Sequence, residues 1–127
     1  MEIYFPGGKK VYAKHRDLTI ATDQPKPAGG DGSAPSPFDL FLASMATCAG
    51  YYVLDFLSQR GIPSEQVRLE AKFTRNESTH LVSKVELDIK LPPDFPDKYR
   101  QAVVKAAELC AVARHLKNPP EISIKAV

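Results

Sequence analysis

The sequence predicts an α+β fold in which strands and helices follow one another in groups and the sheet is largely antiparallel. Three short segments of alternating residues lie near the N-terminus, and two longer alternating segments lie in the middle of the chain. Two segments with helical periodicity separate these groups from one another and from a last short strand-like segment. The predicted order is three strands, a helix, two strands, a helix and a strand, all in a single domain spanning residues 1–127.

The N-terminal group is predicted to be a hairpin followed by a third strand. Residues 2–5 and 10–15 form the hairpin around the turn at residues 6–8, and residues 18–22 alternate as the third strand. Residues 23–37 are rich in proline, glycine, aspartate and serine and have no periodicity. We therefore predict a loop that leads to the first helix.

The first helix has clear start and stop signals. Ser36 is placed to cap it, Pro37 suits its first position, and Asp39 stands where a capping box has its carboxylate. The helix is predicted to run to about Arg60 and to stop at Gly61.

Apolar residues occupy nearly every side of this helix, so one sheet face cannot cover it. Each such side chain contributes roughly 1.5–3 kcal/mol when it is buried, so leaving half of them exposed would lose considerable stability. We therefore predict an obligate homodimer with the helices buried inside it. The residues concerned are Leu40, Phe41, Leu42, Met45, Tyr51, Tyr52, Val53, Leu54, Phe56 and Leu57.

The second half of the chain is predicted to hold a strand pair, a helix and a strand. Residues 66–75 and 80–91 alternate as two strands, with a turn at residues 76–79. An amphipathic helix is predicted from residue 95 or 96 to about Cys110, followed by a short turn. Residues 121–127 are predicted to form the final strand.

Composition excludes several classes of function. Apolar residues make up 43% and charged residues 25% of the chain, as in ordinary globular proteins. The net charge of +2 and the lack of long basic runs argue against a nucleic-acid partner. No secretory signal is recognisable, and polar residues interrupt the longest apolar stretch, so we expect a cytoplasmic protein with no membrane partner.

The two cysteines are the main candidates for chemistry. Cys48 lies within the apolar first helix, and Cys110 lies near the end of the second. In a cytoplasmic chain, two cysteines are more often free or redox-active than a structural disulfide. The alternative for each is a small buried packing residue, because free cysteine is among the most buried residue types.

Two segments resemble the OsmC/Ohr family of thiol peroxidases. The first is AGGDGSAPSPFDLFLASMATC, which ends at Cys48, and the second is AAELCAVAR, which contains Cys110. The resemblance implies an OsmC-like fold and an intertwined homodimer with active sites at the subunit interface. It implies that the protein reduces organic hydroperoxides as part of an antioxidant stress response. It also implies that Cys48 is the peroxidatic residue, that Cys110 resolves it to a disulfide, and that a dithiol, of the lipoyl type, reduces the pair.

The chemistry needs a thiolate at Cys48. An ordinary thiol with a pKa near 8.5 is only about 3% ionised at pH 7. Cys48 lies three turns into its helix, too far to gain from the helix dipole, so we expect a nearby cation. Arg16 and the pair Lys9 and Lys10 are the candidates.

The chain departs from the peroxidase pattern at three places. Where the family has an arginine in the first hairpin, this chain has lysines, and lysine lacks the bidentate fork of arginine. The family's acidic position after the proline holds Phe38, with Asp39 one place later. Asp39 is thus a candidate catalytic carboxylate as well as a capping residue. The family's Cys-Pro is Cys110-Ala111 here, which indicates a divergent OsmC-like branch.

No cofactor is expected. His15, His80 and His115 lie on separate predicted elements without helical pairing, so a zinc site is not predicted either. The second functional hypothesis is a non-catalytic small-molecule-binding or stress-associated protein that keeps the fold. It predicts a Cys48 thiol of near-normal reactivity, whereas the peroxidase predicts an alkylation midpoint well below pH 8.

Overall fold

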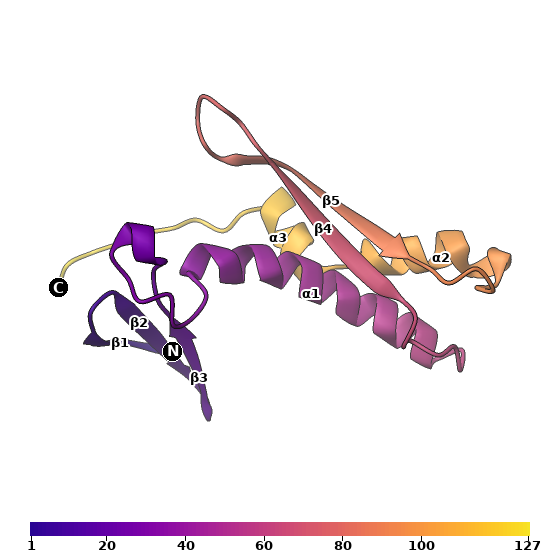
Figure 1. Ribbon diagram of the computed structural model, residues 1–127, viewed down its shortest axis with the longest axis horizontal. Helices are drawn as coiled ribbons and strands as arrows, with labels where there is room; N and C mark the ends of the chain where they lie inside the picture. The colour runs from indigo at the N-terminus through magenta and orange to yellow at the C-terminus, as the bar shows by residue number, and fades with distance from the viewer. The chain divides into compact units, whose positions relative to one another are not determined.

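The chain folds into five strands, three α-helices and one short 3-10 helix in a computed structural model that describes all 127 residues (Figure 1). The strands form two separate antiparallel sheets, of three and two strands. This confirms the predicted α+β class. The chain divides into two units, Met1–Ala43 and Ser44–Val127, whose boundary falls within helix α1 (Pro37–Ser58). The single-domain prediction remains a prediction.

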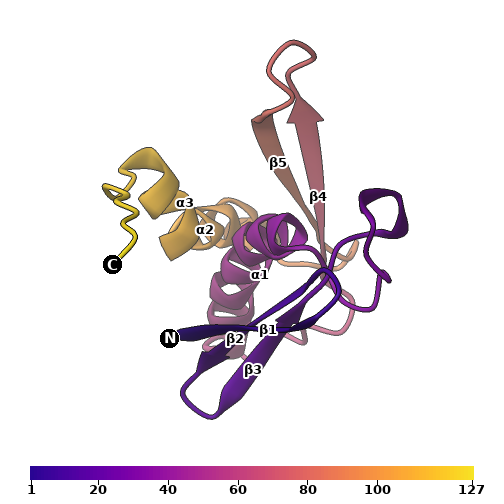
Figure 2. The ribbon, with the colours of Figure 1, turned by 90° about the vertical axis from the view of Figure 1, so that its left-hand side faces the viewer.

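The first unit contains the three N-terminal strands in the order of the chain. β1 (Glu2–Gly7) pairs with β2 (Lys10–His15), and β2 pairs with β3 (Leu18–Thr22), as Figure 2 shows. The two-residue turn between β2 and β3 has Arg16 at a φ of 54°, the left-handed conformation that such tight hairpins use. The strands that the alternation predicts are therefore confirmed.

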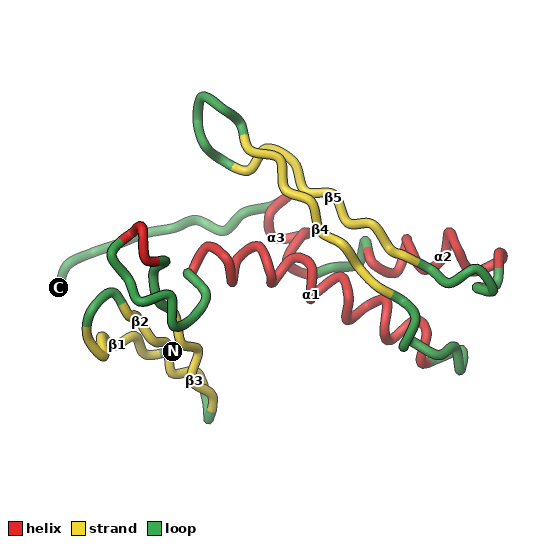
Figure 3. The backbone as a smooth tube through the Cα atoms, in the orientation of Figure 1, coloured by secondary structure: helices red, strands yellow, loops and turns green.

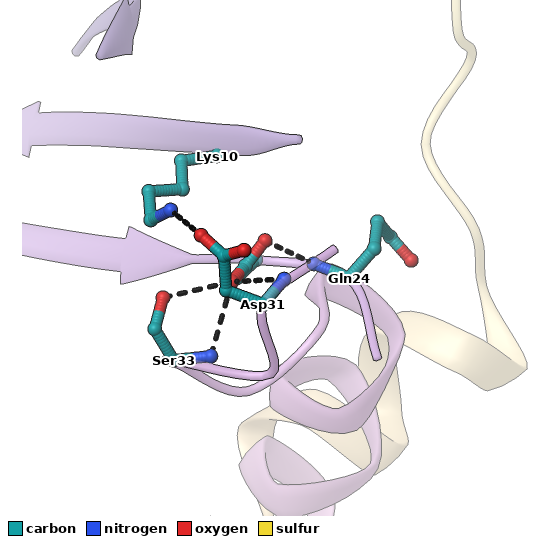
Figure 4. Close-up of polar contacts among 5 residues, drawn as sticks. Lys10, Gln24, Asp31 and Ser33 are labelled. Carbon is teal, nitrogen blue, oxygen red and sulfur yellow. Dashed lines mark hydrogen bonds and ion pairs between the residues drawn. The ribbon is translucent and has the colours of Figure 1, made fainter. Parts of the chain in front are cut away.

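The loop after β3 is organised by one buried carboxylate. Asp23 is 1% exposed and accepts hydrogen bonds from the backbone N–H groups of Gln24 (2.7 Å), Asp31 (3.2 Å) and Ser33 (3.0 Å). The Ser33 hydroxyl donates a fourth at 2.7 Å (Figure 4). These donors, with the Ser33 N–H first, lower the pKa of Asp23 to about 2. The loop predicted for residues 23–37 thus folds around the Asp23 carboxylate, which stays ionised near neutral pH.

Helix α1 begins and ends where the sequence predicts. The Ser36 and Asp39 side chains form a reciprocal capping box, with Asp39 N–H donating to Ser36 Oγ at 3.1 Å and Ser36 N–H to Asp39 Oδ2 at 3.0 Å. At the other end, Gly61 takes a φ of 62° and its N–H bonds to the Ser58 carbonyl. Capping is therefore an observed role of Asp39.

The second unit holds the remaining helices around a two-stranded sheet. β4 (Arg68–Arg75) pairs with β5 (Val82–Lys90), and α2 (Asp97–Ala107) and α3 (Ala111–Lys117) follow. One stripe of α1 is buried in this unit, through Met45, Ala49, Val53, Phe56 and Leu57. The core cluster joins it to the segment before β4 and to α2 through Val53, Phe56, Leu57, Val67, Phe95 and Val103.

The end of the chain differs from the prediction in two places. The second helix stops at Ala107 rather than near Cys110, and a separate helix, α3, replaces the predicted turn. Residues 121–127 form no strand and are exposed, as Figure 3 shows by drawing this segment as loop. A strand needs a hydrogen-bonded neighbour, and none of the five strands pairs with this segment, so its alternating isoleucines were not sufficient.

By length and composition, α1 is apolar enough to cross a membrane, a test that the core helix of a globular protein also passes. The buried stripe of α1 packs within the second unit, as expected of a core helix. Cytoplasmic location remains a prediction.

Candidate functional site

The structure brings the two cysteines together. Cys48 lies on α1 and is partly buried, whereas Cys110 is 2% exposed and is the residue that caps α3. Their side chains are hydrogen-bonded to each other, and both are free thiols. Residues 62 positions apart in sequence thus form one thiol pair within the second unit.

Cys110 is fixed by contacts on two sides. Its thiol faces the Met45 carbonyl of α1, with 3.7 Å between sulfur and oxygen. Its sulfur also accepts a hydrogen bond from the Ala113 N–H at 3.4 Å, which is the geometry of a helix cap. The backbone of Cys110 is not helical (φ −45°, ψ 116°), and this residue lies between the end of α2 at Ala107 and the start of α3 at Ala111.

The surroundings shift the two thiols in opposite directions. The pKa of Cys48 is lowered by the Val112 N–H first, then by the Cys110 thiol and the Ala111 N–H, while burial opposes them. The pKa of Cys110 is raised, mainly because burial disfavours its charged form and because the Cys48 thiolate is adjacent. The geometry therefore favours a thiolate at Cys48 with a protonated Cys110 beside it.

These directions predict that the pair titrates in two steps, with Cys48 losing its proton first. Peptide mass spectrometry of alkylation across pH should give a midpoint for Cys48 below that of an ordinary thiol, and one for Cys110 above it. In urea the two midpoints should converge, because the hydrogen bonds are lost. Equal midpoints in the folded protein would contradict the assignment.

Beside Cys110 lies a groove of about 1470 Å³ within the second unit. Met45 and Ala49 of α1 line it together with residues of β4, β5, α2 and α3. Most of its wall is aliphatic, and Lys90, Lys105 and Lys117 also line it. The groove can therefore hold an apolar molecule close to the resolving candidate of the pair.

The predicted cations all lie in the first unit. The Lys10 ammonium is paired with the Asp31 carboxylate (Figure 4), whose hydrogen bond raises the pKa of Lys10. Arg16 occupies the turn between β2 and β3, and Lys9 lies in the turn that precedes β2. No cation is among the groups that shift the pKa of Cys48. Roles for Arg16, Lys9 and Lys10 in activation, and for Asp39 in catalysis, remain predictions.

Sequence patterns could not identify the groups that lower the pKa of Cys48. Backbone N–H groups are present at almost every residue, so no residue type marks Val112 or Ala111 as donors. The start of α3 at Ala111 was not predicted either, because cysteine is not a usual capping residue. No group of three or more metal-ligating side chains is present.

Comparison with known proteins identifies the fold family. The OsmC-like protein family profile matches residues 30–125. A protein from Psychrobacter arcticus, provisionally described as an osmotic stress induced and detoxification response protein, is 25% identical, with a TM-score of 0.73 over 89% of this chain and 84% of that one.

Two further solved structures share the fold at lower identity. An organic hydroperoxide resistance protein from Legionella pneumophila is 21% identical, with a TM-score of 0.56 over 91% of this chain and 86% of that one. A protein from Vibrio cholerae given the same description, with captopril in one active site, is 18% identical, with a TM-score of 0.55 over 92% and 83%. A search of curated proteins gave no match. The extent of the family match and the shared fold show that the chain belongs to the OsmC-like protein family.

Proposed function

We propose that this protein is a thiol-dependent peroxidase that reduces organic hydroperoxides, with Cys48 as the peroxidatic residue and Cys110 as the resolving one. The observation that carries the proposal is the hydrogen-bonded pair of thiols with opposite pKa shifts. A low pKa supplies the nucleophile, and a raised pKa keeps the second thiol protonated until it is needed.

The reaction balances in three steps. The Cys48 thiolate attacks the outer peroxide oxygen, the O–O bond breaks, and the alkoxide leaves and takes up a proton, which gives an alcohol and a sulfenic acid at Cys48. The Cys110 sulfur then attacks the Cys48 sulfur, so that an S–S bond forms and the hydroxyl leaves as water with the Cys110 proton. An external dithiol reduces the disulfide through a mixed disulfide and becomes oxidised itself.

The groove supports an organic substrate over hydrogen peroxide. Its aliphatic wall, which Cys110 lines, would bury the hydrocarbon part of a hydroperoxide, a contribution that hydrogen peroxide cannot make. The names of the Legionella and Vibrio proteins point to the same substrate class. For the reductant we propose a dithiol of the lipoyl type, on the resemblance alone.

A homodimer is part of the proposal. Tyr51 and Leu54 on α1 are 62% and 52% exposed, and Leu109 and Leu116 are about half exposed. Exposed apolar side chains of this size often mark a surface that binds another protein, and we propose that a second subunit covers them. Sedimentation equilibrium should give twice the mass of the 14.0 kDa chain.

The groove also favours the second candidate, a non-catalytic binder of apolar molecules. That function needs neither a thiolate nor a disulfide, so the two candidates separate at the cysteines. A binder would bind an apolar ligand equally well after both cysteines are replaced by serine.

The deciding experiment treats the reduced protein with one equivalent of cumene hydroperoxide and follows intact and peptide masses. We expect a loss of two hydrogens that maps to a Cys48–Cys110 crosslink and forms faster than with hydrogen peroxide. The Cys110→Ser variant is the matched control, because it should instead gain one oxygen at Cys48. An unchanged mass in the native protein would refute the peroxidase and leave the binder.

A further inference from the structure

The Cys110 thiol contacts two helices at once. Cys110 directly precedes α3 and is 2% exposed. Its thiol donates toward the Met45 carbonyl of α1, with 3.7 Å between sulfur and oxygen, and its sulfur accepts the Ala113 N–H at 3.4 Å. The first contact joins the start of α3 to α1, and the second caps the first turn of α3. One side chain thus uses both its donor and its acceptor capacity to hold α3.

Helix α3 has few other contacts that would keep it folded. It is seven residues long, and none of its residues is buried, although Ala111, Val112 and Ala113 are partly buried. No ion pair of the structure includes a residue of α3. Residues 118–127, which follow it, are exposed and form neither helix nor strand. Because a helix this short is marginal in water by itself, α3 depends on its cap and on the packing of its first turn.

Helix α3 also forms part of the wall of the groove. Ala113, Leu116 and Lys117 line the groove together with Cys110 and with residues of β5 and α2. Leu116 is 47% exposed, so its side chain is only partly enclosed. If α3 unwinds, the groove loses this wall and becomes more open to solvent.

The proposed reaction removes the groups on which the two Cys110 contacts depend. When the disulfide forms, the Cys110 proton leaves with the water, so the Met45 carbonyl loses its S–H donor. Met45 and Cys48 are three residues apart and are neighbours on the surface of α1. The new bond brings the Cys110 sulfur to about 2 Å from the Cys48 sulfur, so the side chain turns away from the Ala113 N–H.

We propose that Cys110 is a redox-controlled cap, which holds α3 as a wall of the groove while the thiols are reduced and releases it when the Cys48–Cys110 disulfide forms. The inference rests on the proposed function, because the disulfide of that reaction is the trigger, and it adds a step of release. The unwound α3 opens the groove, so the alcohol leaves and the dithiol reaches the disulfide. Reduction restores the thiol, the cap and the closed wall.

Hydrogen exchange of the reduced and the oxidised protein, followed by peptide mass spectrometry, tests this inference. Diamide makes the disulfide by taking two hydrogens from the thiol pair, so the test does not require peroxidase activity. We expect residues 111–117 to exchange about fivefold faster in the oxidised protein, because one cap is lost. Exchange in β4 and β5 should stay the same. Cys48→Ser is the matched control, since it keeps Cys110 and cannot form the disulfide, so its exchange should not respond to diamide.

Two substitutions of Cys110 separate the cap from the disulfide. Neither Cys110→Ser nor Cys110→Ala can form the crosslink, but serine keeps an oxygen that accepts the Ala113 N–H, whereas alanine has no acceptor. Exchange in α3 should therefore be slow in Cys110→Ser and as fast in Cys110→Ala as in the oxidised native protein. Exchange in α1 shows whether each variant keeps its fold. Equal exchange of α3 in two folded variants would show that the cap does not hold this helix.

These results separate failure of the inference from failure of the proposed function. Exchange in residues 111–117 that is unchanged or slower in the oxidised native protein would overturn the inference, whatever the peroxidase activity. A thiol pair that diamide cannot crosslink would overturn it as well. Faster exchange in a protein that never consumes cumene hydroperoxide would instead keep the redox-controlled cap and reject the peroxidase.

Discussion

Replacing Cys48 with serine is expected to abolish dithiol-dependent reduction of cumene hydroperoxide, with a loss of at least about a thousandfold. A serine hydroxyl is not ionised near neutral pH, so the two amides and the thiol that act on Cys48 would have no anion to stabilise. The fold should be kept, because Cys48 is only partly buried and serine is slightly smaller. Peroxide consumption with a dithiol as electron donor measures the effect.

Replacing Cys110 with serine should have a different signature. The serine hydroxyl can still donate toward Cys48, so one equivalent of alcohol should form at close to the native rate. The sulfenic acid then has no resolving thiol, and excess peroxide should carry it on to sulfinic acid. If Cys110→Ser turned over as fast as the native protein, Cys110 would be a packing residue and the resolving role would be wrong.

The sequence was a good guide to local structure in the first half of the chain. The capping pair Ser36 and Asp39, the stop at Gly61 and the first three strands depend on neighbouring residues, and all are confirmed. The pairing of Cys48 with Cys110 came from the family resemblance, since no local pattern relates residues so distant in sequence. Their contact is visible only once α1 and α3 are packed together.

Tertiary contacts explain where the sequence was insufficient. The amphipathic pattern predicts a second helix that runs to about Cys110, whereas α2 ends at Ala107. The buried contact of Cys110 with Met45, and the capping bond from Ala113, instead accompany a break at Cys110. Residues 121–127 show the converse, because a strand-like sequence forms no strand without a partner.

The second large effect is expected at Gly30, in the loop that Asp23 organises. A Cβ at this position would lie 2.0 Å from the Gln24 carbonyl oxygen, 2.6 Å from its carbon and 2.8 Å from Asp23 Oδ1. Two of these atoms belong to the backbone, and the third accepts the hydrogen bond from the Gln24 N–H, so none can move alone. Gly30→Ala should therefore destabilise the protein by about 3 kcal/mol or more.

Two other glycines are matched controls for this substitution. Gly32, in the same loop, has a φ of 65° but no atom within 4 Å of an added Cβ, so Gly32→Ala should cost only about 1–2 kcal/mol. Gly50 lies inside α1, with Leu69 Cδ2 at 3.9 Å as its one neighbour, so Gly50→Ala should stabilise by about 0.5–1 kcal/mol. A Gly30→Ala variant no less stable than Gly32→Ala in urea unfolding would show that the loop can open around the added methyl group.

The same variant tests whether residues 1–127 behave as one domain. Gly30 and Asp23 lie in the first unit, whereas the thiol pair lies in the second. If the chain is one cooperative domain, Gly30→Ala should shift the urea midpoints of backbone circular dichroism and of Cys110 alkylation together. If the alkylation midpoint stays in place while the circular dichroism midpoint falls, the two units unfold separately, and the single-domain prediction is wrong.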